Sequence, residues 1–185
     1  MISKIVGIRP TGRLHLGHLF AVINPAVDDR NVDVLIAELH AVGSTSADVD
    51  MVIRTLRFYG VLESQIRIQS EIFNHRLFYL LCDKASLGQL ERMTQYKSSS
   101  NPTLQLLLYP IKMAVDIAGY NQVIVGDDQK QHVEFARDLL QGRYDPLPEA
   151  ITSGGRIHSL KSDSKMSKSD PQGCIGVGCC VCVTT

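Results

Sequence analysis

The sequence predicts an α/β fold with a parallel sheet, because short apolar runs typical of strands alternate with segments of helical spacing. Five such elements alternate in the first 70 residues: strand 3–8, helix 14–24, strand 33–39, helix 48–59 and strand 65–69. A mostly helical segment at about 71–120 then precedes a further strand and helix within residues 122–141. The chain has 185 residues, 44% of them hydrophobic, which is enough for one domain with a substantial core.

Particular residues support each of the first elements. Pro25 should end the first helix, because proline cannot donate a backbone hydrogen bond. The run 33–39 is apolar almost without interruption, as in a strand that is covered on both faces. Asp48 is a typical helix N-cap and Gly60 a typical helix stop. Residues 65–69 alternate between polar and apolar side chains, as a third strand would.

The second half of the chain predicts three helices, one strand and a final helix. The helices are expected over 71–83, 86–94 and about 103–118, with a polar loop at 97–102. Residues 122–125 predict a fourth strand, and Gly126 to Gln129 lead from it into a helix that ends near residue 141. This alternation indicates a Rossmann-like parallel sheet with an inserted, mostly helical segment, and ligands bind such sheets at the carboxyl ends of the strands.

Charge and composition limit the partners and the location of the protein. It has 19 basic and 19 acidic residues, so its formal net charge is zero and a broad grip on nucleic acid is not indicated. Residues 51–120 hold a modest basic excess, with eight basic against five acidic side chains. No apolar run is long enough to span a membrane, and the amino terminus lacks a secretion signal. We therefore expect a cytoplasmic protein without a membrane partner.

Four of the five cysteines lie in the last twelve residues of the chain, at positions 174, 179, 180 and 182. Their spacing does not match that of a zinc site, and nothing in the sequence indicates an oxidising compartment in which disulfides would form. We therefore expect residues 171–185 to form a flexible appendage.

The turn after the first strand carries two histidines. The helix after this turn should point its free backbone N–H groups outward, which favours phosphate binding. His15 and His18 are three residues apart and share a helical face, and Gly17 leaves room for a ligand against the backbone. The pattern fits a nucleotide site, but also two ordinary surface histidines. A metal site would need further ligands, and no other cluster is evident.

A second motif near the other end of the chain favours the nucleotide site. Residues 165–169 read Lys-Met-Ser-Lys-Ser, and two lysines three residues apart can close over a triphosphate. His-Leu-Gly-His followed by Lys-Met-Ser-Lys-Ser resembles the signature pair of the class I aminoacyl-tRNA synthetases. Within that class, five segments resemble the tryptophanyl-tRNA synthetases: 7–12, 90–97, 109–117, 125–134 and 156–160.

The resemblance implies an enzyme that activates tryptophan with ATP and Mg²⁺ and transfers it to the acceptor end of a tRNA. It implies catalytic roles for His15, His18, Lys165 and Lys168. It implies that ATP is bound by Arg9, Pro10, Thr11, Gly17, His18, Gly126, Asp127, Asp128, Ile157, Lys165, Met166, Ser167, Lys168 and Ser169. It implies that the amino acid is bound by Gly7, Met113, Asp116, Val123, Val125 and Gln129. No metal ligand from the protein is expected.

Asp116 is the residue from which selectivity is expected, because an indole N–H can only donate a hydrogen bond and needs an acceptor. The resemblance also implies a homodimer, and a catalytic domain over residues 1–170. Within that domain we expect the helical insertion at about 71–120 and a mobile lysine loop at about 161–170.

The sequence departs from the family in ways that leave alternatives open. Residues 171–185 do not resemble the segment after the lysine motif in the family, so we expect the anticodon-binding domain to be absent. Arg9 and Ile5 differ from residues common at those places, so tyrosine or another aromatic substrate is conceivable. Two other functions remain possible, namely an adenylate-forming relative that serves another acceptor, and an inactive module that binds tRNA or a partner subunit.

Overall fold

The computed structural model describes residues 2–44, 47–152, 157–161, 166 and 171–178. The chain divides into two compact units, one comprising residue 1, residues 5–71 and 153–185, and the other comprising residues 2–4 and 72–152. The sheet has the strand order β3-β2-β1-β4-β5, where β1 is Lys4–Ile8, β2 Val32–Ile36, β3 Ile66–Ile68, β4 Gln122–Val125 and β5 Glu149–Thr152. This order, with helices between successive strands, confirms the α/β, Rossmann-like fold with a mostly helical insertion.

The first unit carries the three strands that were predicted for the first 70 residues. These are β1 (Lys4–Ile8), β2 (Val32–Ile36) and β3 (Ile66–Ile68). Strands β2 and β3 run parallel, with Val34 opposite Ile66. The helical elements are α1 (Leu16–His18), α2 (Asn24–Asp28), α3 (Val49–Phe58) and α4 (Gln69–Ile72), with short 3₁₀ turns at Glu38–His40, Glu63–Gln65 and Pro171–Gly173.

The prediction that Pro25 ends the first helix is wrong. A π-helical turn over Leu19–Ile23 joins α1 to α2, and Pro25 is the second residue of α2, so the helical run continues to Asp28. A proline has no backbone N–H to pair, and the first turn of an α-helical segment tolerates that loss. The wider π turn in front of Pro25 lets a new α-helical segment begin there.

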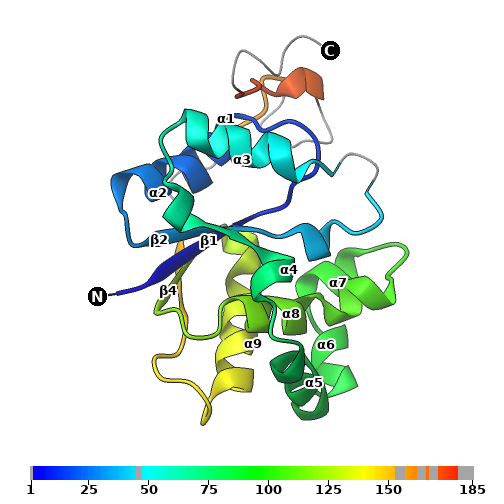
Figure 1. Cartoon of the computed structure of the whole chain (residues 1–185). Helices are drawn as coiled ribbons and strands as arrows, with labels where there is room; N and C mark the ends of the chain where they lie inside the picture. Colours follow the sequence, from blue (N-terminus) through cyan, green and yellow to red (C-terminus); the bar gives the residue numbers. More distant parts are fainter. Residues whose placement is uncertain (1, 45–46, 153–156, 162–165, 167–170, 179–185) are drawn as a thin grey trace. The chain divides into compact units, whose positions relative to one another are not determined.

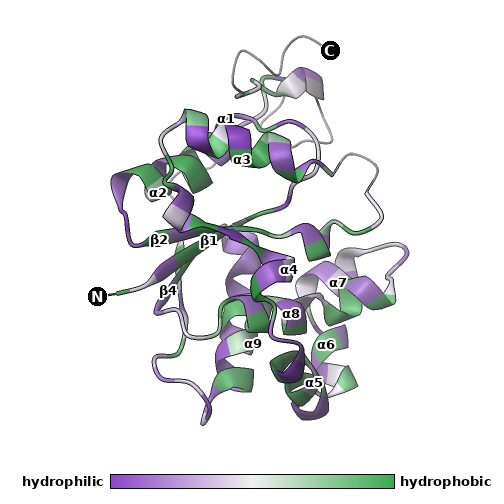
Figure 2. Ribbon diagram, viewed as in Figure 1, coloured by the Kyte–Doolittle hydropathy of each residue, from purple (hydrophilic) through white to green (hydrophobic). Residues whose placement is uncertain are grey.

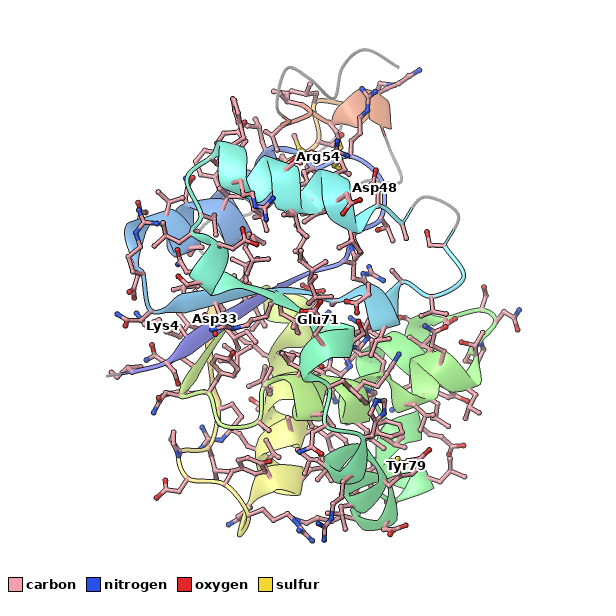
Figure 3. All side chains as sticks on the ribbon, in the orientation of Figure 1. Lys4, Asp33, Asp48, Arg54, Glu71 and Tyr79 are labelled. Atoms are coloured by element: carbon pink, nitrogen blue, oxygen red, sulfur yellow. The ribbon has the colours of Figure 1, made fainter. Side chains whose placement is uncertain are left out.

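Helix α3 confirms the predicted capping residues. Asp48 stands at its start (Figure 3), where the carboxylate accepts a hydrogen bond of 2.8 Å from the backbone N–H of Met51. Gly60 follows the helix with φ of +91°, a conformation that favours glycine. The ribbon of α3 shows hydrophobic and hydrophilic residues along its length (Figure 2), and Val52 and Leu56 are fully buried. The helix therefore packs through one face.

The second unit holds the predicted fourth strand and an additional one. Strands β4 (Gln122–Val125) and β5 (Glu149–Thr152) run parallel, with Val123 opposite Ala150. The sequence did not predict β5, because Glu-Ala-Ile-Thr lacks the run of β-branched apolar residues that marks β4, which reads Gln-Val-Ile-Val. The helices of this unit are α5 (His75–Lys84), α6 (Leu87–Glu91), α7 (Thr94–Ser98), α8 (Leu104–Asp116) and α9 (Lys130–Leu140).

Two predicted helices are each divided in the structure. The helix expected over 71–83 breaks at Asn74, whose side-chain oxygen accepts a 2.9 Å hydrogen bond from the N–H of Leu77 and so starts α5. The helix expected over 86–94 ends at Glu91, and α7 then extends into the predicted polar loop. At the first break the Asn74 cap overrides the longer apolar period, whereas no side-chain cap starts α7.

Helices α8 and α9 form the centre of the second unit. They pack along each other (Figure 1), and their facing residues are buried. The buried residues include Ile111, Ala114, Val133, Ala136 and Leu140. The Lys84 ammonium donates hydrogen bonds to the carbonyls of Asp138, Leu139 and Gln141, which satisfies the carboxyl end of α9. Among the helices of the described residues, none has the length and apolar character needed to cross a membrane.

Candidate active site

The turn between β1 and α1 is held in place by its own backbone. Gly12 has φ of +61°, which only glycine adopts readily. The carbonyl of Pro10 accepts a hydrogen bond of 2.8 Å from the N–H of Asp48, and Thr11 pairs with Ala47. Pro10 is buried and Thr11 half-buried, while Arg9 is exposed. The start of α3 therefore fixes the turn that leads to the two histidines.

His15 and His18 hold each other through reciprocal contacts at the start of α1. Nδ1 of His15 accepts a hydrogen bond of 3.1 Å from the Gly17 N–H, and Nδ1 of His18 accepts one of 3.2 Å from the His15 N–H. The ring centroids are 3.9 Å apart. Because Nδ1 accepts in both neutral rings, the proton of each ring lies on Nε2. Both imidazoles are therefore fixed as Nε2–H donors, the form that a phosphate oxygen requires.

Gly17 is needed for a reason that the sequence did not reveal. A Cβ atom at this position would lie 2.8 Å from Cε1 and 3.0 Å from Nδ1 of His15. The glycine therefore makes room for the His15 imidazole, whereas the sequence suggested that it makes room for a ligand. The short spacing from His15 to Gly17 is the signal that could have indicated this contact.

The variant Gly17→Ala should displace the His15 ring from its cap, because the added methyl group occupies the place of that ring. Loss of a cap of this kind costs about 0.5–2 kcal/mol of stability. The expected result is a lower unfolding free energy in urea together with a reduced affinity for ATP. As a control, Gly88→Ala in α6 adds a methyl group whose nearest neighbour is the tip of the Arg92 side chain at 4.0 Å. Equal effects of the two substitutions would contradict this assignment.

The backbone donors at the start of α1 are already engaged, which corrects the expectation of free N–H groups there. The N–H of Leu16 donates to the carbonyl of Ile175 at 3.0 Å, and the N–H of His18 donates to the carbonyl of His15 at 2.7 Å. The helix start therefore does not present these two backbone N–H groups to an anion.

Residues 171–178 lie against this turn, in a pairing that the sequence did not indicate. The N–H of Val177 donates to the carbonyl of Leu14 at 2.9 Å, and Gly176 pairs with His15 in an antiparallel bridge. The carbonyl of Gly173 also accepts a hydrogen bond of 2.9 Å from the N–H of Leu160. The bridge between His15 and Gly176 connects residues more than 150 positions apart, so local sequence patterns could not indicate it.

Only part of the lysine motif lies within the described residues. Met166 is 4% exposed, and its N–H donates to the carbonyl of Ile157 at 2.9 Å. Ile157 itself is half-buried. The predicted residues Lys165, Ser167, Lys168 and Ser169 lie outside the described part of the chain.

In the second unit, the predicted ribose-binding junction comes directly after β4. The side chain of Asp127 forms an ion pair of 2.8 Å with Lys130, and the hydrogen bond from Lys130 lowers the pKa of the Asp127 carboxyl. Asp128 is exposed, and its carboxylate accepts a hydrogen bond of 2.9 Å from the side-chain amide of Gln129. Asp127 and Asp128 belong to a 3₁₀ turn over Asp127–Gln129, and Gly126 is the residue directly before this turn.

Gln129 is held by two residues that the sequence did not single out. The Tyr109 hydroxyl donates to its Oε1 at 3.1 Å, and Nδ1 of His132 lies 3.2 Å from the same oxygen. Tyr109 belongs to α8 and His132 to α9, so two helices meet at this amide. The spacing of Gln129 and His132, three residues apart at a helix start, could have indicated one of the two contacts.

Asp116 is the last residue of α8 and is 8% exposed. Lys112 lies one helical turn before it and is half-buried. Burial lowers the pKa of the Lys112 ammonium, and the charge of Asp116 opposes that change. Met113 lies on the same helix and is buried, as is Val123 on β4, while Val125 is half-buried. The helix thus places a carboxylate among apolar residues with a cation nearby.

A cavity of about 190 Å³ adjoins Asp116 within the second unit. Its lining residues are Ile72, Phe73, Asn74, Leu77, Val115, Asp116, Ala118, Tyr120 and Tyr144. Of the residues predicted to bind the amino acid, only Asp116 lines it, and Met113, Val123 and Val125 do not.

The fold and these residues define a Rossmann-like α/β protein, with a histidine-bearing turn after one strand and an acidic junction after another. The model of the family described as tRNA synthetases class I (W and Y) matches residues 2–177. The chain therefore belongs to this family of class I tRNA synthetases. The match includes residues 171–177, which in the sequence analysis did not resemble the family.

Individual relatives agree with the family. The tryptophan–tRNA ligase of Parasynechococcus marenigrum (strain WH8102) is 36% identical over 198 residues, which cover 89% of this chain and 59% of the relative. The tryptophanyl-tRNA synthetase structure from Mycoplasma pneumoniae has a TM-score of 0.82 at 31% identity, covering 95% of this chain and 60% of the other. The Campylobacter jejuni enzyme in complex with ADP and tryptophan has a TM-score of 0.78 at 27% identity, with 95% and 62% covered. The chain thus spans less than two thirds of the length of these relatives.

Proposed function

We propose that the chain activates L-tryptophan with ATP to form tryptophanyl-adenylate, and transfers the aminoacyl group to the acceptor end of tRNA(Trp). The observation that carries this proposal is the pair of imidazoles of His15 and His18, each fixed with its proton on Nε2. A relative with 27% identity binds ADP and tryptophan, which supports both substrates.

In the first step a carboxylate oxygen of tryptophan attacks the α-phosphorus of ATP. A new P–O bond forms while the bond from the α-phosphorus to the bridging oxygen breaks, and pyrophosphate leaves with the electron pair. The protein supplies position and positive charge in this step. His15 and His18 would donate their Nε2–H groups to phosphate oxygens, and Lys165 and Lys168 would stabilise the charge of the departing pyrophosphate.

The remaining nucleotide contacts are proposed for residues of the two motifs and their surroundings: Arg9, Pro10, Thr11, Gly17, Gly126, Asp127, Asp128, Ile157, Met166, Ser167 and Ser169. Asp128, with its exposed carboxylate, would accept hydrogen bonds from ribose hydroxyls. Within the described residues, no group of three or more His, Cys, Asp or Glu could hold a metal ion. The proposed Mg²⁺ ion would be bound chiefly through the phosphates of ATP.

Tryptophan binding is proposed for Gly7, Met113, Asp116, Val123, Val125 and Gln129. The carboxylate of Asp116 would accept the hydrogen bond of the indole N–H. Met113 would contact the ring through its polarizable sulfur. The residues 1–170 would form the catalytic domain of a homodimeric, cytoplasmic enzyme, as the resemblance implies.

Asp116→Ala is expected to weaken tryptophan binding by about 1–3 kcal/mol, because the variant leaves the indole N–H without an acceptor. The helix should tolerate the change, since alanine favours helices and Asp116 has apolar neighbours. Titration calorimetry with tryptophan measures the change, and titration with ATP serves as the control that should stay unaffected. An unchanged tryptophan affinity in a folded variant would contradict the assignment of Asp116.

Tryptophan-dependent exchange of pyrophosphate into ATP tests the proposed activation step without tRNA. We expect exchange with tryptophan and little with other amino acids. Folded protein that exchanges with neither tryptophan nor tyrosine would refute the proposed function.

A further inference from the structure

We infer that His132 is a positioning residue, which together with Tyr109 fixes the side-chain amide of Gln129 for binding of the amino acid. The inference rests on the proposed function, because the role of Gln129 in amino-acid binding is part of that proposal. The structural basis lies entirely within the second unit, where α8, α9 and the turn between β4 and α9 supply the three residues.

His132 is buried in the first turn of α9 with 1% of its surface exposed. A buried polar side chain is costly unless it forms hydrogen bonds, so its contacts have to account for its place. Nδ1 of His132 lies 3.2 Å from Oε1 of Gln129. An amide oxygen can only accept, so Nδ1 carries the proton in this contact and His132 is a donor.

Tyr109 gives the same oxygen a second hydrogen bond. Its hydroxyl donates to Oε1 of Gln129 at 3.1 Å, and its ring packs edge-on against the His132 ring with centroids 5.2 Å apart. On the other side of the amide, Nε2 of Gln129 donates to the Asp128 carboxylate at 2.9 Å. Two donors on the oxygen and one acceptor on the nitrogen allow a single orientation of this amide.

The Asp128 carboxylate decides the orientation, because a flipped amide would direct its oxygen at a group that can only accept. The network therefore excludes the second orientation, which a glutamine on a surface turn would otherwise adopt freely. Gln129 is half-buried, and it lies after the strand β4 at the edge where parallel sheets bind ligands. A preset amide at this place spares the ligand the cost of ordering it.

The test compares three variants of the full chain by tryptophan titration calorimetry and by the KM for tryptophan in pyrophosphate exchange. His132→Leu removes the donor but keeps an apolar side chain, and is expected to weaken tryptophan binding about 10-fold. His132→Asn keeps an N–H near the position of Nδ1 and should restore most of the affinity. Tyr109→Phe removes only a hydroxyl and should weaken tryptophan binding in the same direction. In all three variants the KM for ATP should change less than the affinity for tryptophan, because the network reaches the proposed nucleotide contacts only through Asp128 and does not touch the proposed phosphate donors.

A Gln129→Ala background separates positioning from packing. If His132 acts through Gln129, His132→Leu should cause no further loss of tryptophan affinity in that background. An equal further loss there, or equal effects of His132→Leu and His132→Asn, would overturn the inference. If the unaltered protein binds tryptophan but shows no exchange, the proposed reaction fails while the binding measurements still decide the role of His132. If it binds no tryptophan, both proposals fail.

Discussion

Replacing His15 by alanine is expected to lower the turnover of tryptophan-dependent pyrophosphate exchange by about 10²–10³-fold. This is the typical loss when one fixed donor to a developing charge is removed. His15 is 7% exposed and its Nδ1 is engaged by the Gly17 N–H, so its contribution to catalysis has to come from the Nε2–H side. The KM for tryptophan should change little, because the donor acts on phosphate.

Two conservative variants separate the capping contact of His15 from its phosphate contact. His15→Asn places an oxygen where Nδ1 now accepts the Gly17 N–H, so it should keep the stability of the turn but lose the turnover. His15→Gln places an N–H near Nε2 and lacks the cap, so it should retain more of the turnover and lose stability. Steady-state kinetics and urea unfolding of both variants measure the two effects. Full turnover in His15→Asn would contradict the role of Nε2–H.

Replacing Lys165 and Lys168 together by alanine is expected to lower the turnover by about 10²-fold or more, because both ammonium groups would stabilise the departing pyrophosphate. The effect should fall on kcat and leave the KM for tryptophan nearly unchanged, as for contacts that strengthen in the transition state. Lys161→Ala is the matched control, since this exposed lysine is hydrogen-bonded to Gln172.

Two outcomes would contradict the proposed roles of the two lysines. A double variant with unchanged turnover would mean that the lysine motif does not contact the reacting phosphates. If Lys161→Ala lowered the turnover by the same factor, the effect would come from positive charge in this part of the chain in general. The two lysines of the motif would then have no specific role.

Elements with local signals could be predicted from the sequence. The cap by Asp48 was predicted and is confirmed. The cap by Asn74 was not predicted, because the apolar spacing around it indicated one continuous helix over 71–83. Pro25 shows the limit of a local rule, because a π-helical turn in front of it allows the helical run to continue.

Contacts between distant residues could not be read from the sequence. The bridge between His15 and Gly176 joins positions that no local period relates, and it places the segment after the lysine motif against the turn with the two histidines. The contact from Tyr109 to Gln129 spans two helices. For the candidate site, the resemblance pointed to His15, His18 and Gln129, but the protonation of the two rings and the partners of Gln129 are evident only from the geometry.

Pyrophosphate exchange measured side by side with tryptophan, tyrosine and no amino acid tests the central claim most directly. The imidazole pair of His15 and His18 and the buried carboxylate of Asp116 together predict exchange that depends on tryptophan and falls sharply in His15→Ala. Folded protein that shows no exchange with tryptophan, or the same exchange in the unaltered chain and in His15→Ala, would contradict it.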